Sequence, residues 1–155
     1  RPAASPRGLS RNRTELIIFP YRYDNGLKKI GENFCNEFPL AYEYLERYRD
    51  ELEKSNKDSG ALWFEYGRSQ ALTKINTEKL LISPIVSNKV NVTILDQMHI
   101  PYSGIVITAK NNNLLTEAKR ILESEDFLKY IESIGIKSNG NSIRISGTDI
   151  KKYKY

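Results

Sequence analysis

The second half of the sequence constrains the fold most strongly, because two short apolar runs there precede two helical patterns. The runs at residues 90–95 and 104–109 have the length and the β-branched composition of strands. Apolar residues at helical spacing follow over 114–124 and 126–134, with Ser124 placed to cap the second helix. This mixture predicts an α+β fold: a mixed, mostly antiparallel small sheet or sheets with about three to four flanking helices.

The first half of the chain carries its most regular helical pattern at residues 39–54. Pro39 suits the first turn, and Tyr44 and Tyr48 fall on the apolar face, where we expect them to be core residues. Oppositely charged residues four positions apart support the exposed faces. The remaining patterns predict a short helix over 69–75 and strands over 15–21, 62–66, 79–86 (interrupted by Pro84) and 142–146.

Arginine, proline, alanine and serine dominate the start of the chain, so we expect residues 1–14 to form a flexible linker or arm. The remaining residues, 15–155, have a length suited to one domain with its own core. The chain starts inside the basic segment without a methionine, and we interpret it as a fragment of a longer protein.

The formal net charge of +5 is unevenly distributed along the chain. Four of the 24 basic residues precede the first acid, Glu15, and the remainder is nearly neutral. A nearly balanced domain with basic segments can bind phosphates, although it is not a strong nonspecific DNA-coating protein. A solvated basic tail and ordinary surface lysines would produce the same distribution.

Several classes of chemistry have no support in the sequence. A single cysteine, Cys35, excludes an internal disulfide and suits the cytoplasm, and with one histidine, His99, a zinc site is not expected. There is no bilayer-length apolar run, no glycine-rich phosphate loop, no serine nucleophile elbow and no Asp/Asn-Pro-Pro-aromatic tetrapeptide. We therefore expect no membrane partner, and no catalytic residue, metal or cofactor in this chain.

An aromatic run leads directly into Arg68, Ser69 and Gln70. Arginine and glutamine can each make two parallel hydrogen bonds to a base edge, arginine to guanine and glutamine to adenine. We therefore predict base-edge or phosphate contacts for these three residues, with Lys74 and Lys79 as positioning contacts to phosphate. In the alternative interpretation, the aromatic strand is part of the core and Arg68 pairs with an acid.

A magnesium-dependent restriction-type nuclease is the alternative function. Such enzymes hold magnesium between an aspartate and a downstream acid-x-Lys, a spacing that Asp96, Glu117 and Lys119 approach. However, residues 117 and 119 lie in a helical pattern, where side chains two positions apart do not face the same way. We rank this hypothesis below nucleic-acid binding. A protein-interaction domain whose basic segments are simply soluble surface is a third possibility.

The order of short segments along the chain carries a resemblance to a known family. The segments are 18–21 (IFPY), 38–45 (FPLAYEYL), 63–68 (WFEYGR), 79–84 (KLLISP), 114–115 (LL), 122–124 (LES) and 144–150 (RISGTDI). The series covers nearly the whole chain. It resembles the C-terminal target-recognition domain (TaqI-like specificity domain) of bacterial-type adenine-N6 DNA methyltransferases in type II restriction–modification systems.

The resemblance implies a domain that reads a sequence in double-stranded DNA and helps to hold the duplex while the target adenine is extruded. It also implies that the parent protein binds S-adenosylmethionine in a methyltransferase domain N-terminal to Arg1. That domain would be the partner of this chain, which would perform no methyl transfer itself.

Specificity domains of this kind read bases from loops, and three loops are candidates: 87–91, 110–113 and 137–141. The last is the strongest cluster, because nearby glycines allow the backbone to approach a groove. Its expected DNA contacts are Lys137, Asn139, Asn141 and Arg144. In the alternative interpretation, the Asn-Gly pair there is an ordinary turn.

Overall fold

The structure is a computed structural model that describes residues 1–13, 15–109, 112–138 and 140–155. The chain divides into two compact units: unit 1 contains residues 1–16 and 77–155, and unit 2 contains residues 17–76. We expected one domain over 15–155, but the N-terminal residues belong to the same unit as the C-terminal half. No helix in the described ranges is both long and apolar enough to cross a membrane.

Unit 1 is built around β5 (Lys79–Ile82), the central strand of an antiparallel sheet. Its neighbours are β7 (Val92–Leu95) and β9 (Ile105–Thr108), which confirm the strands expected over 90–95 and 104–109. All four residues of β5 are buried, so both faces of the sheet are covered here. Alternate β5 residues point to opposite faces.

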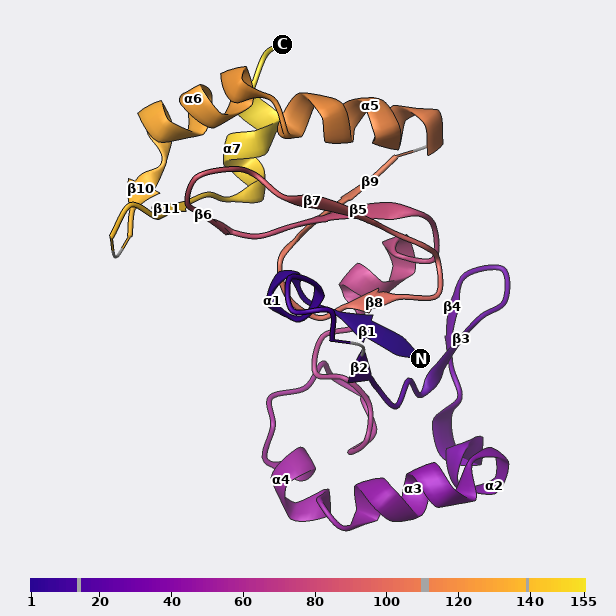
Figure 1. Cartoon of the computed structure of the whole chain (residues 1–155). Coiled ribbons are helices and arrows are strands. Elements are labelled where there is room, and N and C mark those ends of the chain that lie inside the picture. The colour runs from indigo at the N-terminus through magenta and orange to yellow at the C-terminus, as the bar shows by residue number, and fades with distance from the viewer. Residues whose placement is uncertain (14, 110–111, 139) are drawn as a thin grey trace. The chain divides into compact units, whose positions relative to one another are not determined.

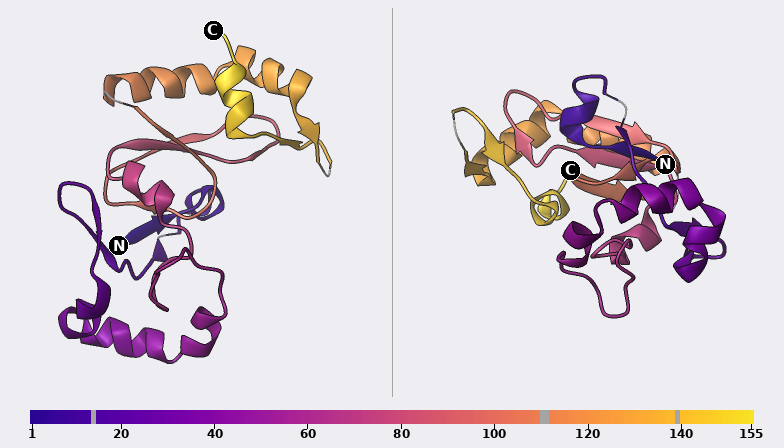
Figure 2. Two further views of the ribbon diagram at one scale, coloured as in Figure 1. Left: turned by 180° about the vertical axis from the view of Figure 1, so that it is seen from behind. Right: turned by 90° about the horizontal axis from the view of Figure 1, so that it is seen from below.

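Two helices cover one face of this sheet, as Figures 1 and 2 show. They are α5 (Asn112–Leu122) and α6 (Glu125–Ile134), close to the expected bounds. The hydroxyl of Ser124 accepts a hydrogen bond from the N–H of Phe127 (3.2 Å), which confirms the expected cap. The core below these helices contains Leu80, Ile82, Val86, Val90, Val92, Leu115, Leu122, Phe127, Ile131, Ile143 and Ile145.

The N-terminal segment covers the opposite face of the sheet. Strand β1 (Pro2–Ala4) pairs with β2 (Glu15–Leu16) and with β8 (Ile100–Pro101), and α1 (Pro6–Leu9) follows β1. Ala4 packs against Leu81 of β5. The expectation of a flexible arm over 1–14 is therefore wrong for the described residues of this segment, because the apolar face at Leu81 is covered by them.

A second small antiparallel sheet extends from the main core of unit 1. It has the order β10 (Ile136–Lys137), β11 (Ile143–Arg144) and β6 (Ile85–Val86). The strand expected over 79–86 is thus split at Ser83 and Pro84 into β5 and β6. The expected basic tail begins with a further helix, α7 (Gly147–Lys152), closed at its start by a capping box between Ser146 and Asp149.

Unit 2 contains the helix expected over 39–54, but in two pieces. These are α3 (Pro39–Glu46) and α4 (Arg49–Glu53), and neither buries a residue. At the break, the N–H of Tyr48 donates to the carbonyl of Leu45 (2.9 Å), which tightens the turn. Tyr44 and Tyr48 are 51% and 45% exposed, so the prediction that they are core residues is wrong.

Aromatic side chains supply most of the interior of unit 2. Phe64 stacks on Phe34, and Trp63 contacts Tyr42 edge to face. The remaining elements here are β3 (Tyr21–Tyr23), β4 (Leu27–Lys29), the 3-10 turns η1 (Gly31–Asn33) and η2 (Gln70–Lys74), and α2 (Phe34–Glu37).

The predicted strand at 62–66 is a turn. The N–H of Glu65 donates to the carbonyl of Leu62 (3.0 Å), and the Glu65 carboxylate accepts from the N–H of Leu62 (3.1 Å). The N–H of Tyr66 donates to the hydroxyl of Tyr21 (2.9 Å). Side-chain partners thus replace the ladder that a strand would need. As a whole, the fold is α+β with small, mostly antiparallel sheets, as predicted.

Candidate nucleic-acid interface

The best candidate site is a groove in unit 1 between α1 and the strands β5, β6 and β7, with a volume of about 1110 Å³. Its polar lining residues are Arg7, Ser10, Ser83, Ser87, Asn88, Lys89, Asn91 and Thr93. Its apolar lining residues are Pro6, Leu9, Leu81 and Ile85. Of the described residues that line it, none carries a carboxylate, so the groove offers cations, amides and hydroxyls only.

Helix α1 forms one wall and is held firmly although it is short. Ser5, which is buried, caps it by accepting a hydrogen bond from the N–H of Gly8 (3.0 Å), and Pro6 occupies the first turn. The hydroxyl of Tyr102 also donates to the Ser5 hydroxyl (2.9 Å). These contacts fix the backbone that carries Arg7, whose side chain is exposed.

The loop between β6 and β7, residues 87–91, also lines the groove. Val86 and Val92 at its ends and Val90 within it belong to the main core. Asn88, Lys89 and Asn91 are exposed. The loop therefore presents one ammonium and two amides from a backbone that is anchored at three points.

The β10–β11 hairpin adjoins this groove. In the ladder, Arg144 pairs with Ile85, a lining residue, and cross-strand partners project to the same face. The hydroxyls of Ser87 and Ser142 lie 3.0 Å apart and join the loop to the hairpin. The structure thus brings the predicted contact Arg144 close to the groove, where it is exposed.

Two more of the predicted contacts lie on the same hairpin. Lys137 on β10 is exposed and pairs with Ile143, and Asn141 is exposed in the turn. Asn139 lies outside the described residues, as does part of the candidate loop 110–113. By the same pairing rule Lys137 projects to the face opposite to Arg144, so the hairpin adds Arg144 beside the groove, with Asn141 in its turn.

Lys79 does not fulfil its predicted role. Its side chain is fully buried at the start of β5, where the ammonium donates to the carbonyls of Asp96 (2.7 Å) and Thr77 (2.9 Å). Burial is the main reason why its pKa falls from 10.5 to about 8. A lysine enclosed in this way cannot contact a phosphate, so the prediction of a positioning contact is wrong.

The other predicted contacts are in unit 2. Arg68, Gln70 and Lys74 are exposed, and Ser69 is half-buried, with its N–H donating to the Asp58 carboxylate (3.3 Å). Because 62–66 is a turn, these residues do not follow the end of a strand: Arg68 and Ser69 lie on irregular backbone, and Gln70 and Lys74 lie on η2. Their exposure leaves them free to contact a ligand of unit 2.

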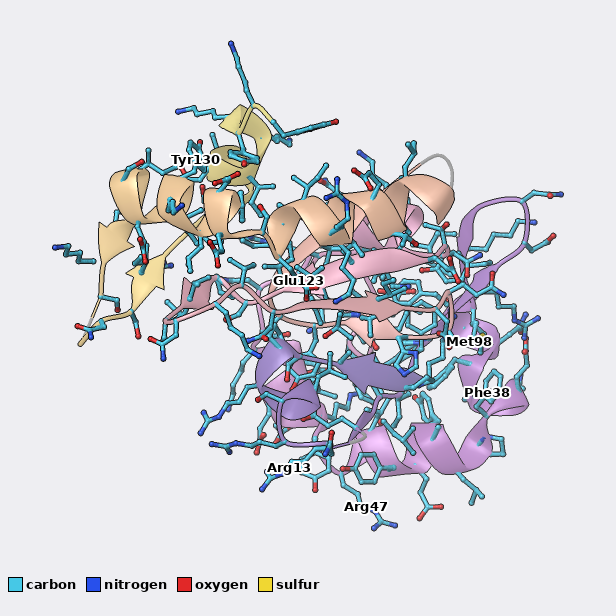
Figure 3. The ribbon with its side chains drawn as sticks, turned by 45° about the horizontal axis from the view of Figure 1, so that its top comes forward. Arg13, Phe38, Arg47, Met98, Glu123 and Tyr130 are labelled. Carbon is cyan, nitrogen blue, oxygen red and sulfur yellow. The ribbon has the colours of Figure 1, made fainter. Side chains whose placement is uncertain are left out.

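An ion pair closes the edge of the sheet beside the loop. Glu123, which directly follows α5 and is labelled in Figure 3, accepts from the N–H of Val92 (3.0 Å) and from the ammonium of Lys119 (2.7 Å). The Lys119 ammonium also donates to the carbonyl of Val92. Burial alone would raise the pKa of the Glu123 carboxyl. The hydrogen bonds from Lys119 and Val92 together have the larger effect, so the pKa lies below its ordinary value. The backbone N–H and carbonyl of Val92 are thereby both satisfied at the start of β7.

The nuclease arrangement is not assembled, because each of its residues has a local partner. Lys119 is held as just described, Glu117 pairs with Arg120 (2.6 Å), and Asp96 accepts from the ring of His99 (2.8 Å). The hydrogen bond from His99 holds the pKa of the Asp96 carboxyl below its usual range. Within the described ranges, no three His, Cys, Asp or Glu residues are grouped so that they could hold a metal ion.

Sequence reasoning missed Arg7 and Lys89 as site residues. By sequence, Arg7 falls in the expected flexible arm, and Lys89 falls in the candidate loop 87–91 without an expected contact of its own. A signal was present, because the walls come from two stretches without acids, one before Glu15 and one between Glu78 and Asp96. Comparisons with protein-family models, curated proteins and solved structures found no match to this chain.

Proposed function

We propose that this chain is a sequence-specific recognition domain for double-stranded DNA. The observation that carries the proposal is the groove of unit 1, lined by Arg7, Lys89 and several amides and hydroxyls, with no carboxylate among its described lining residues. Neither cation has an ion-pair partner in the part of the chain that the structure describes. Glu123 interacts electrostatically with Lys89 but forms no ion pair with it, so both cations stay available to a polyanion. Each phosphate contact would release condensed counterions.

The groove and hairpin also offer the two kinds of contact that specific DNA binding requires. Cations position the duplex through its phosphates, while amides can read base edges. Arg7 and Lys89 line the groove, and Arg144, paired with the lining residue Ile85, extends the cationic surface onto the hairpin. A net charge of only +5 favours a protein that depends on such local contacts over one that coats DNA uniformly.

The parent activity that we propose is site-specific adenine-N6 DNA methylation in a restriction–modification system. The support is the ordered series of segments that resembles the specificity domain of such enzymes. In this proposal a methyltransferase domain of the same polypeptide binds S-adenosylmethionine and carries the catalytic Asp/Asn-Pro-Pro-aromatic tetrapeptide. The present chain selects the DNA site, and the whole protein acts in the cytoplasm.

The test of DNA binding is fluorescence anisotropy with a labelled duplex over a range of salt concentrations. We expect the affinity of the whole chain to fall steeply with salt, and Arg7→Ala and Lys89→Ala each to reduce the slope of log K against log salt by about 0.9. Arg120→Ala is the matched control, because it removes one exposed charge from α5, where it pairs with Glu117. An unchanged slope in Arg7→Ala and Lys89→Ala would place the binding surface elsewhere.

Specificity is tested separately by selection from a library of randomised duplexes. We expect one short sequence to be enriched and to resist competition by scrambled duplexes at the same salt concentration. Binding without any enriched sequence would contradict recognition and leave only nonspecific attraction.

A further inference from the structure

We infer that the loop 87–91 is the base-reading element of the groove and that Asn88 and Asn91 recognise adenine in the major groove. This inference deepens the proposed function and rests on it. Three features of this loop support the inference: its anchoring, its composition and its connection to the hairpin.

The anchoring makes the loop suitable for a precise readout. Val86, Val90 and Val92 are 2%, 4% and 4% exposed and belong to one core cluster, while Asn88 and Asn91 are exposed on either side of Val90. A reading side chain must be held in a defined place, which a scaffold achieves by fixing the backbone on both sides of it.

The amides of Asn88 and Asn91 are unoccupied. Neither makes a side-chain hydrogen bond to another described residue, although both line the groove. An asparagine amide carries one acceptor and one donor group, which match the N6 donor and N7 acceptor that adenine presents in the major groove. Guanine presents two acceptors at that edge, so a single amide cannot pair with both of them.

Lys89, between the two asparagines, has a different role. Its ammonium has donors only and no ion-pair partner among the described residues, which suits a phosphate beside the base that is read. The hydrogen bond between Ser87 and Ser142 then ties this loop to the hairpin that carries Arg144. The loop would thus contribute sequence preference through its amides and affinity through its cation.

The test combines variants of the protein with variants of the base. The whole chain, Asn88→Ala, Asn91→Ala and Lys89→Ala are each subjected to selection from randomised duplexes. Gln97→Ala is the matched control, because it deletes an exposed amide of unit 1 that does not line the groove. Thermal melting of each variant verifies that it is folded.

We expect Asn88→Ala and Asn91→Ala each to lose the preference for adenine at a position of the enriched site, while Lys89→Ala weakens all duplexes alike. In the second arm, 7-deazaadenine replaces adenine at that position and removes only the N7 acceptor. The affinity of the unmodified chain should fall roughly two- to tenfold, which is the contribution expected of one hydrogen bond. The asparagine variant should lose nothing further, because the contact is already absent.

The outcomes separate the inference from the proposed function. If the unmodified chain enriches a sequence but the asparagine variants keep every preference, DNA recognition stands and the reading role of this loop is overturned. Loss of preference at a guanine position would overturn the assignment of adenine. If the unmodified chain binds no duplex, the proposed function fails, and the reading role fails with it.

Discussion

Lys79 shows how strongly a single position can depend on the tertiary fold. It occupies the end of a fully buried strand, and its ammonium donates to the backbone carbonyls of Thr77 and Asp96. Because burial disfavours the charged form, its pKa falls to about 8 in the folded protein, against 10.5 in the exposed state. The unfolded chain therefore binds more protons than the folded chain between these two values.

It follows that Lys79 makes the protein more stable as the pH rises from about 8 towards about 10.5, by up to roughly 3 kcal/mol. Urea unfolding of the wild type should show this gain, and Lys79→Met should lack it, because methionine does not titrate. Burial raises the pKa values of Tyr21 and Tyr66 above 10.0, which acts in the opposite sense at higher pH. The measurements therefore stop at about pH 9.5.

Lys129→Met is the control for Lys79→Met, since Lys129 is an exposed lysine of α6. It should keep the pH dependence of the wild type. Equal pH dependence in Lys79→Met and the wild type would show that the Lys79 ammonium is not buried as the structure has it.

At the scale of elements, the groove depends on the turn between β8 and β9, which supports α1. Gly104 in this turn has a φ of +101°, and a Cβ there would lie 2.8 Å from Leu81 Cδ1 and 2.9 Å from Pro6 Cγ. Pro6 is the first residue of α1, so any side chain at position 104 presses on the wall of the groove.

We therefore expect Gly104→Ala to lower the free energy of unfolding by about 2 kcal/mol or more, from strain and overpacking together. It should also weaken DNA binding, because α1 carries Arg7. Gly60→Ala separates the two effects: its φ is +74°, but a Cβ there meets no atom within 4 Å. If Gly104→Ala and Gly60→Ala lower the free energy of unfolding by the same amount, the close packing around Gly104 does not contribute to stability.

Helix α7 offers a second test at this scale, because the sequence pattern did not indicate it. The hydroxyl and the N–H of Ser146 donate to the Asp149 carboxylate (2.7 and 2.8 Å), and the Asp149 N–H donates back to the hydroxyl (3.3 Å). Ser146→Ala should cost about 1 kcal/mol of stability in chemical denaturation. Thr148→Ala, on the exposed face of the same helix, should cost clearly less; equal losses would argue against the cap.

At the scale of the whole molecule, the two units differ in how much apolar surface they bury. In unit 1, β5 is buried at every residue and lies within an extensive core. In unit 2, α3 and α4 bury no residue and expose Leu40 (81%). Segments with few buried contacts open more readily than the core does.

Amide hydrogen exchange should therefore show early exchange throughout α3 and α4 and late exchange in β5. Within unit 1, α6, which buries Phe127 and Ile131, serves as a helical control for α3. We expect α6 to be the more protected helix. Equal protection of α3 and α6 would mean that α3 is covered by something that the described contacts do not include.

Local patterns in the sequence predicted those helices and strands that bury one regular face. The periodicity of α5 and α6, the Ser124 cap and the strands β7 and β9 could all be recognised, because helix and strand periods directly reflect which face is buried. The candidate loop 87–91 and the cation Arg144 could also be named from composition. Predictions failed where tertiary packing decided the outcome: Tyr66 bonds the distant Tyr21, and Tyr44 stays 51% exposed on a helix that buries no residue.

The sequence by itself determined an α+β chain with an acid-free N-terminal segment, an acid-free stretch from 79 to 95 and amides in exposed loops. Tertiary structure alone decided that the first residues cover Leu81, that the ammonium of Lys79 is enclosed, and that Arg7 and Lys89 line one groove. The physical reason is that these outcomes depend on pairings between residues far apart in the chain, such as β1 with β8. No local pattern encodes such pairings.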